Sequence, residues 1–121
     1  MLALSLATLV SEHVVAARAA SSGRSARTIH DGHQHRLRQT LLALAAGRSL
    51  GDHDSPDEAT LYVLYGHMRL TTTTQTWNAT VGDYLVIPAQ RHNLAAIEDS
   101  AVLLTVATPP AVLDAPWNTR P

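Results

Sequence analysis

Two histidines, His53 and His92, are the residues of this chain whose types and positions could do chemistry together. Each stands close to a run of apolar residues, and about forty residues separate them. Imidazole nitrogens bind transition metals and also make hydrogen bonds in buried pockets. Whether the two rings meet depends on whether the apolar runs are buried strands of one small barrel.

The composition limits the other chemistry open to the chain. All nine basic residues are arginine, so Schiff-base and lysine general-base catalysis are excluded. The absence of cysteine excludes disulfides, thiolate metal sites and cysteine nucleophiles. Among side-chain nitrogens, only those of the seven histidines are expected to bind a transition metal. A formal net charge of −1 gives little attraction for a phosphate backbone, so we expect no nucleic-acid partner.

The N-terminal residues are apolar but lack the features of a secretion signal. No basic residue precedes the apolar run over residues 1–10, and Glu12 and His13 interrupt it. The run is also much shorter than the roughly 20 residues that cross a bilayer. Leucine and valine recur near the helical period, which predicts a helix within residues 1–22. We therefore expect a cytoplasmic protein with no membrane partner.

The rest of the chain is typical of short strands separated by turns. Residues 23–35 are expected to form a polar connector, and residues 109–121 a tail. Residues 36–46 fit helical and strand spacing equally well, so periodicity leaves them open. Short strands without intervening helices predict an all-β sandwich or barrel over residues 36–108. The predicted strands are 60–65, 68–73, 75–79, 84–87, 92–97 and 101–107.

These elements resemble a small single-domain cupin over roughly residues 36–107. The resemblance is strongest in the second half, in Gly82-Asp83, Ile87-Pro88, His92 and the segment 98–106. It implies a jelly-roll β-barrel, preceded here by the N-terminal helix, and it implies that residues 36–45 are a strand. The usual family motifs supply two histidines and a glutamate from the first motif, and a histidine from the second, as metal ligands.

The chain departs from that ligand set. His53 takes the first histidine position and His92 the last, but Ser55 stands where the second histidine is usual. Ala59 occupies the usual glutamate position, with Glu58 beside it. The Pro-x-Gly step of the second motif is replaced by Pro88-Ala89-Gln90. The resemblance therefore carries over two of the four usual ligands.

Metal binding at His53 and His92 is one interpretation of the site. The ion would be zinc, iron, nickel or manganese, and catalytic sites of this kind use at least three protein ligands. Glu58 is a candidate third ligand if its strand is locally bulged, because regular alternation with Ala59 directs it outward. His33 or His35 of the connector is another candidate, since alternate side chains share a face if the chain is extended. Alternatively, the two histidines line a pocket and are satisfied by hydrogen bonds or water.

Three further residues are candidates for a ligand pocket. Gln39 has a plausible inward position on the first barrel strand, and Ser55 lies close to His53. Arg91 could hold a carboxylate through two hydrogen bonds, although a residue at the rim is the commoner role for such an arginine. Ser55 lacks the G-x-S-x-G context of a hydrolase nucleophile.

Three functions are compatible with these observations. The first is a small-molecule-binding or sensing protein with a degenerate metal site. The second is a metal-dependent enzyme of the dioxygenase or isomerase type, with His53 and His92 as ligands. The third is a structural module in which the barrel holds the helix for dimerisation. The apolar helix and the open edge strands of a small barrel predict a homodimer in each case.

Overall fold

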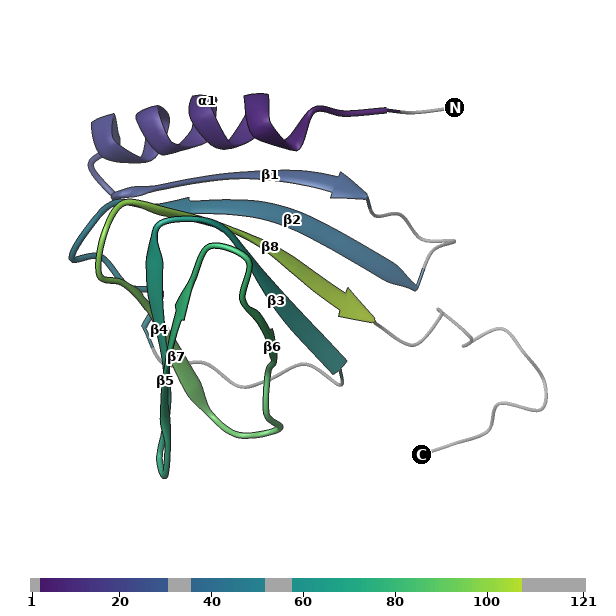
Figure 1. Cartoon of the computed structure of the whole chain (residues 1–121), viewed down its shortest axis with the longest axis vertical. Coiled ribbons are helices and arrows are strands. Elements are labelled where there is room, and N and C mark those ends of the chain that lie inside the picture. Colours follow the sequence, from purple (N-terminus) through teal and green to yellow (C-terminus); the bar gives the residue numbers. More distant parts are fainter. Residues whose placement is uncertain (1–2, 31–35, 52–57, 108–121) are drawn as a thin grey trace.

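The structure is a computed structural model that describes residues 3–30, 36–51 and 58–107. Within these ranges the chain forms a helix followed by eight strands (Figure 1). The helix is α1 (Leu6–Ala19). The strands are β1 (Arg24–His30), β2 (Leu37–Leu44), β3 (Glu58–Tyr65), β4 (His67–Thr72), β5 (Thr76–Thr80), β6 (Tyr84–Val86), β7 (His92–Ala96) and β8 (Ser100–Ala107).

The strands form two antiparallel sheets. The larger sheet has the order β1-β2-β8-β3-β6, and the smaller has the order β5-β4-β7. Strands β2 and β8 pair along eight residues, from Leu37 opposite Ala107 to Leu44 opposite Ser100. The predicted all-β jelly roll with an N-terminal helix is confirmed.

The main core lies between the two sheets, where alternate residues of each strand point inward. In β3 the buried residues are Ala59, Leu61 and Val63, and the residues between them are more exposed. Met68 and Leu70 of β4 face them from the smaller sheet, and both are 1% exposed. This alternation follows from the two-residue period of a strand.

Helix α1 packs on the outer face of the larger sheet, against β1, β2 and β8. The side chain of Ser5 caps its first turn by accepting a hydrogen bond from the Thr8 backbone N–H at 3.2 Å. Ala17 meets Ala43 and Ala101 of the sheet, and these small side chains let the helix approach closely. Within the described ranges, no helix has the length and apolar character needed to traverse a bilayer.

The start of the predicted connector is corrected by the structure, because residues 24–30 form strand β1. This strand pairs with β2 from Arg24 opposite Leu44 to His30 opposite Gln39. Its side chains are exposed or half-buried, so its sequence lacks the apolar alternation of an inner strand. Residues 36–46, which periodicity left open, contain strand β2, as the resemblance implied. Residues 31–35 and the predicted tail, 109–121, lie outside the described residues.

Candidate functional site

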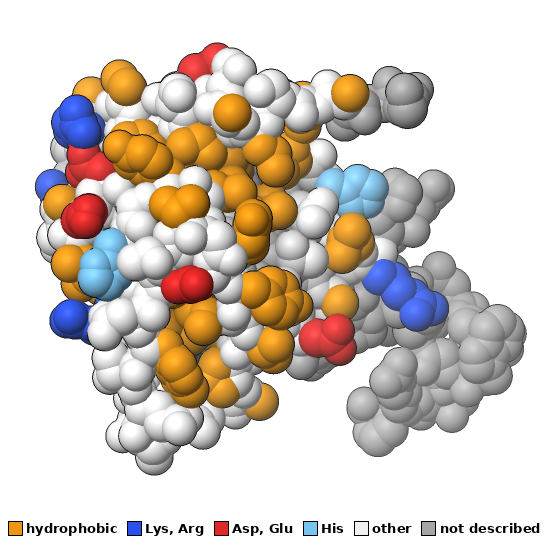
Figure 2. Space-filling model, in the orientation of Figure 1, with side chains coloured by type: hydrophobic (Ala, Val, Ile, Leu, Met, Phe, Trp, Pro, Cys, Tyr) orange, Lys and Arg blue, Asp and Glu red, His pale blue; other side chains and the backbone are white. Residues whose placement is uncertain are grey.

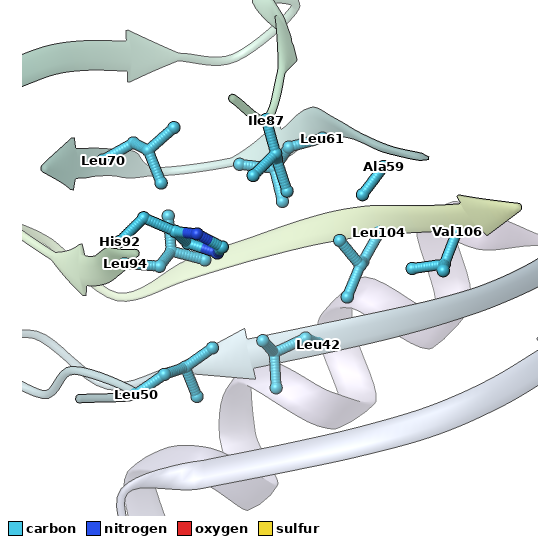
Figure 3. Close-up of a pocket in the computed structure, with 10 residues that line it drawn as sticks. All are labelled: Leu42, Leu50, Ala59, Leu61, Leu70, Ile87, His92, Leu94, Leu104 and Val106. Carbon is cyan, nitrogen blue, oxygen red and sulfur yellow. The ribbon is translucent and has the colours of Figure 1, made fainter. Parts of the chain in front are cut away.

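An interior cavity of about 120 Å³ lies between the two sheets. Figure 3 shows its lining side chains, which converge on the cavity from strands of both sheets. Nine of the ten are aliphatic and the tenth is a histidine: Leu42, Leu50, Ala59, Leu61, Leu70, Ile87, His92, Leu94, Leu104 and Val106. Among the described residues, the lining is therefore apolar apart from one imidazole ring.

Strand alternation explains why the walls are aliphatic. Ala59 and Leu61 are two residues apart on β3, and Leu104 and Val106 are two apart on β8. Residues at such spacing share one face of a strand. The Ala59–Val106 and Leu61–Leu104 pairs lie directly opposite each other, so each pair presents its side chains to the same side of the sheet.

His92 begins β7, and its side chain is held by the turn that precedes the strand. The backbone N–H of Gln90 donates to the carbonyl of Pro88 at 2.8 Å, and His92 Nδ1 lies 3.0 Å from the Gln90 carbonyl oxygen. Because a carbonyl can only accept, Nδ1 carries the proton in this hydrogen bond. In the neutral ring Nε2 is then the acceptor or metal-binding nitrogen. The residue is only 4% exposed, and its ring points toward the cavity in Figure 3.

A second hollow, of about 300 Å³, also includes His92 in its lining. It lies beside the ends of β4 and β7, where Thr72 pairs with His92. Its other residues are polar: Arg91, Asn93 and the threonines 71–73. Asn93 Oδ1 is buried there and has no hydrogen-bond partner within the described part of the chain. Arg91 thus belongs to a polar hollow beside the cavity and does not line the cavity itself.

Gln39 does not face the cavity, which corrects its predicted position. Its amide donates to Thr105 Oγ1 at 3.3 Å, and the two residues are opposite each other in the β2–β8 pair. The cavity is lined instead by Leu42 and Leu104, which belong to the other face of the same strands. A one-residue error in the phase of a strand moves a side chain to the opposite face.

Glu58 is also directed away from the cavity. It is exposed at the start of β3, whereas the next residue, Ala59, is 2% exposed and lines the cavity. The alternation within β3 therefore removes Glu58 as a third metal ligand in this structure. In the described ranges, no group of three histidine, aspartate or glutamate side chains is placed to hold a metal ion.

The remaining candidates lie outside the described residues. His53 and Ser55 fall in residues 52–57, and His33 and His35 fall in residues 31–35. Of the two predicted histidine ligands, the structure therefore places His92 alone. The aliphatic wall was missing from the predicted pocket, although the apolar residues of the predicted strands 60–65 and 101–107 were a signal for it.

The clearest electrostatic feature lies away from the cavity. Asp99 Oδ1 accepts a hydrogen bond from the Ala46 backbone N–H at 2.8 Å. Its Oδ2 accepts from Arg18 of α1, with the guanidinium Nε at 2.8 Å. These two hydrogen bonds, that of Ala46 first, hold the pKa of the Asp99 carboxyl below its usual value. Asp99 therefore fastens the helix to the barrel and takes no part in the cavity.

Several solved structures share the fold of this chain. A protein of unknown function from Streptococcus pyogenes is 30% identical, with a TM-score of 0.67 over 76% of this chain and 80% of that one. A cupin superfamily protein from Desulfitobacterium hafniense is 18% identical, with a TM-score of 0.65 over 71% and 78% of the two chains. The protein KdgF from Halomonas sp. is also 18% identical, with a TM-score of 0.61 over 71% and 81%. At that identity the last two show the fold alone.

The family comparison covers most of the barrel. The family model described as the cupin domain matches residues 40–108, which begin within β2 and extend past the end of β8. None of the curated proteins matches the chain. The match spans more than half of the sequence and includes most of the strands that line the cavity, so this chain belongs to the cupin domain family.

Proposed function

We propose that this chain is a small-molecule-binding or sensing cupin-domain protein whose ligand occupies the barrel cavity beside His92. The observation that supports this function is the cavity itself, which lies between the two sheets and whose described lining is one imidazole ring among aliphatic side chains. Ligand pockets are commonly apolar hollows with a few placed polar groups. His92 meets that description because the Gln90 carbonyl fixes its ring.

Nuclear magnetic resonance of the whole chain tests this function. Amide signals would be recorded while a set of small, water-soluble molecules is added to the protein. A ligand of the cavity should shift the signals of Leu61, His92 and Leu104, which lie on three different strands around it. The outward-facing Tyr62 and Thr105 serve as internal controls. If no molecule binds, or if the shifts cluster away from the cavity, the proposed function is wrong.

A metal-dependent enzyme of the dioxygenase or isomerase type is the second candidate. One observation favours it: His92 donates through Nδ1 to a backbone carbonyl, the arrangement that commonly orients a metal-binding histidine. The described residues nevertheless supply a single candidate ligand at the cavity, where catalytic zinc and iron sites use at least three. We therefore derive no reaction step through a metal. His53 remains the proposed partner of His92 in such a site.

Elemental analysis separates the two candidates. The chain would be purified without a tag or chelator and incubated with zinc, iron, nickel or manganese. Near-stoichiometric metal that is lost in both His53→Ala and His92→Ala would support the enzyme. A His30→Ala variant is the control, since His30 lies on β1, outside the cavity lining. Protein that retains no metal after incubation would contradict the enzyme and leave the binding function.

A further inference from the structure

We propose that the ligand of the cavity carries a carboxylate, which Arg38 binds beside the cavity, near the beginning of β2. This inference rests on the proposed function and names a polar group of the ligand at the same site. Arg38 was not among the candidates drawn from the sequence, although it lies on the same strand as the cavity-lining Leu42.

The pairing of β2 decides on which side of the sheet Arg38 lies. Leu42 lines the cavity, and Thr40 and Arg38 lie two and four residues before it on the strand. Strands β2 and β8 pair along this whole stretch without a shift of register. Residues two apart share one face of a strand. Arg38 and Thr40 therefore lie on the inner face of the larger sheet, the face on which the cavity lies.

The partners of these two residues on β8 place them next to the cavity wall. Arg38 lies directly opposite Val106, and Thr40 lies directly opposite Leu104. Both Val106 and Leu104 line the cavity. The Cβ atoms of directly opposite residues are about 4.5–5.5 Å apart. Arg38 and Thr40 are therefore immediate neighbours of the aliphatic lining.

The inner face of the larger sheet changes from apolar to polar at this place. Thr28 of β1 lies opposite Thr40, so two hydroxyl side chains adjoin Leu104 in one row across the sheet. Thr40 is half-buried and Arg38 is exposed. An arginine can lay its carbon stem along apolar surface while its guanidinium stays in water. Arg38 can therefore cover Val106 with its stem and hold its charge at the boundary between cavity and solvent.

Positive charge is available at this boundary. In Figure 2 arginine side chains, coloured blue, lie at the end of the larger sheet where β2 begins. Arg38 forms no salt bridge with a carboxylate of the described residues. Its guanidinium presents a planar fork of N–H donors, which matches the two oxygens of a carboxylate. A carboxylate is therefore a polar group that this boundary suits.

The cavity limits the carbon body of such a ligand. An apolar protein cavity of about 150 Å³ accepts a benzene ring. The present cavity, at about 120 Å³, is somewhat smaller, and its described walls are mainly aliphatic. The ligand is therefore a short-chain carboxylic acid in its ionised form. Its carbon chain lies between the two sheets, and its carboxylate lies at Arg38.

The test compares butyrate with 1-butanol, which have the same number of carbon atoms and differ in charge. Their dissociation constants would be measured near pH 7 and at low salt, from the amide signals of Leu61 and Leu104 in the full chain. We expect butyrate to bind at least tenfold more tightly than 1-butanol, because it adds charge-assisted hydrogen bonds. Added salt should weaken only butyrate, since salt screens exposed charges.

Two arginine variants locate the carboxylate. Arg38→Gln should weaken butyrate about tenfold and change 1-butanol by less than about twofold. Arg27→Gln is the matched control, because Arg27 is also exposed but lies opposite Leu41, on the face away from the cavity. This control should change either affinity by less than about twofold. If Arg38→Gln does not fold, Arg38→Met, which keeps an apolar stem, replaces it.

Other outcomes overturn the inference in distinguishable ways. If both probes shift the cavity signals but butyrate binds no more tightly than 1-butanol, the carboxylate is refuted and the proposed function stands. Butyrate binding that Arg38→Gln leaves unchanged would place the carboxylate elsewhere and refute the inference. Equal weakening by Arg38→Gln and Arg27→Gln would also refute it, because net charge alone would explain the loss. Failure of every small molecule to bind in the cavity would refute the function itself.

Discussion

The Gly66→Ala substitution should destabilise the barrel far more than the same change at Gly82. Both glycines have left-handed backbone, with φ of +84° and +90°. An alanine in that conformation costs about 1–2 kcal/mol at either site, because its Cβ crowds the neighbouring carbonyl. The two sites differ in the space around the added carbon.

At Gly66 an added Cβ would lie 2.2 Å from the Asp99 carbonyl oxygen and 2.3 Å from Ser100 Oγ. Ordinary van der Waals contact begins near 3.4 Å, so the backbone at Asp99 and Ser100 must move by about an ångström. Ser100 Oγ accepts from the His67 backbone N–H at 2.9 Å and lies 3.1 Å from the His67 carbonyl, so the movement also strains these bonds. Overpacking of this kind adds about 1–3 kcal/mol, for a total of about 3–5 kcal/mol.

At Gly82 nothing lies within 4 Å of the added carbon, so only the backbone strain of about 1–2 kcal/mol applies. Urea denaturation followed by circular dichroism gives the free energy of unfolding of both variants. The difference between them should be about 1–3 kcal/mol. If the two variants lose the same stability within about 0.5 kcal/mol, the close approach of Gly66 to Ser100 does not constrain the turn.

Two further predictions concern the cavity wall and the helix attachment. Leu61→Ala enlarges the cavity at a side chain that is only 1% exposed, so it should lower the free energy of unfolding by about 2–5 kcal/mol. Thr60→Ala, on the outer face, should lower it by less than about 1 kcal/mol. Equal losses of stability in urea denaturation would contradict the faces assigned to the two residues. Because the folded state lowers the pKa of Asp99, its carboxylate contributes stability above the unfolded pKa of about 4 and loses it as the pH falls through the folded value. Asp99→Asn should therefore be less stable than the wild-type chain near pH 7, by less than about 1 kcal/mol, and this difference should shrink as the pH falls below about 4. A stability difference that does not change between these pH values would show that the charge contributes nothing.

The strands that sequence reasoning located best are those whose two faces differ most. Residues 60–65 fall within β3 because aliphatic and more polar side chains alternate there, as a half-buried strand requires. Strand β1 was missed because its side chains are largely polar and exposed, so its edge position beside β2 leaves no apolar period in the sequence. Residues 36–46 could not be assigned from spacing alone, since pairing with β1 and β8 decides their conformation.

The site was predicted only in part, because the pairing partners of a strand decide which of its faces is buried. His92 was singled out by the strand that stops at Pro88, and the structure places its ring at the cavity. Gln39 was assigned to the wrong face, because a strand's period distinguishes two faces but does not say which one is inside. That choice depends on the register of β2 against β8, which pairs residues 56 to 70 positions apart.

The sequence by itself determined the all-β class, the N-terminal helix, the absence of cysteine and lysine chemistry, and the aliphatic character of the inner strands. These properties follow from residue types and short-range periods, which do not depend on distant partners. Only the tertiary structure decided that the described lining of the cavity is apolar apart from the His92 imidazole, that Gln39 faces outward, and that Tyr62 and Tyr84 of the larger sheet remain exposed. The physical reason is that strand pairing and helix packing select which face of each strand is buried, and distant segments of the chain make that selection together.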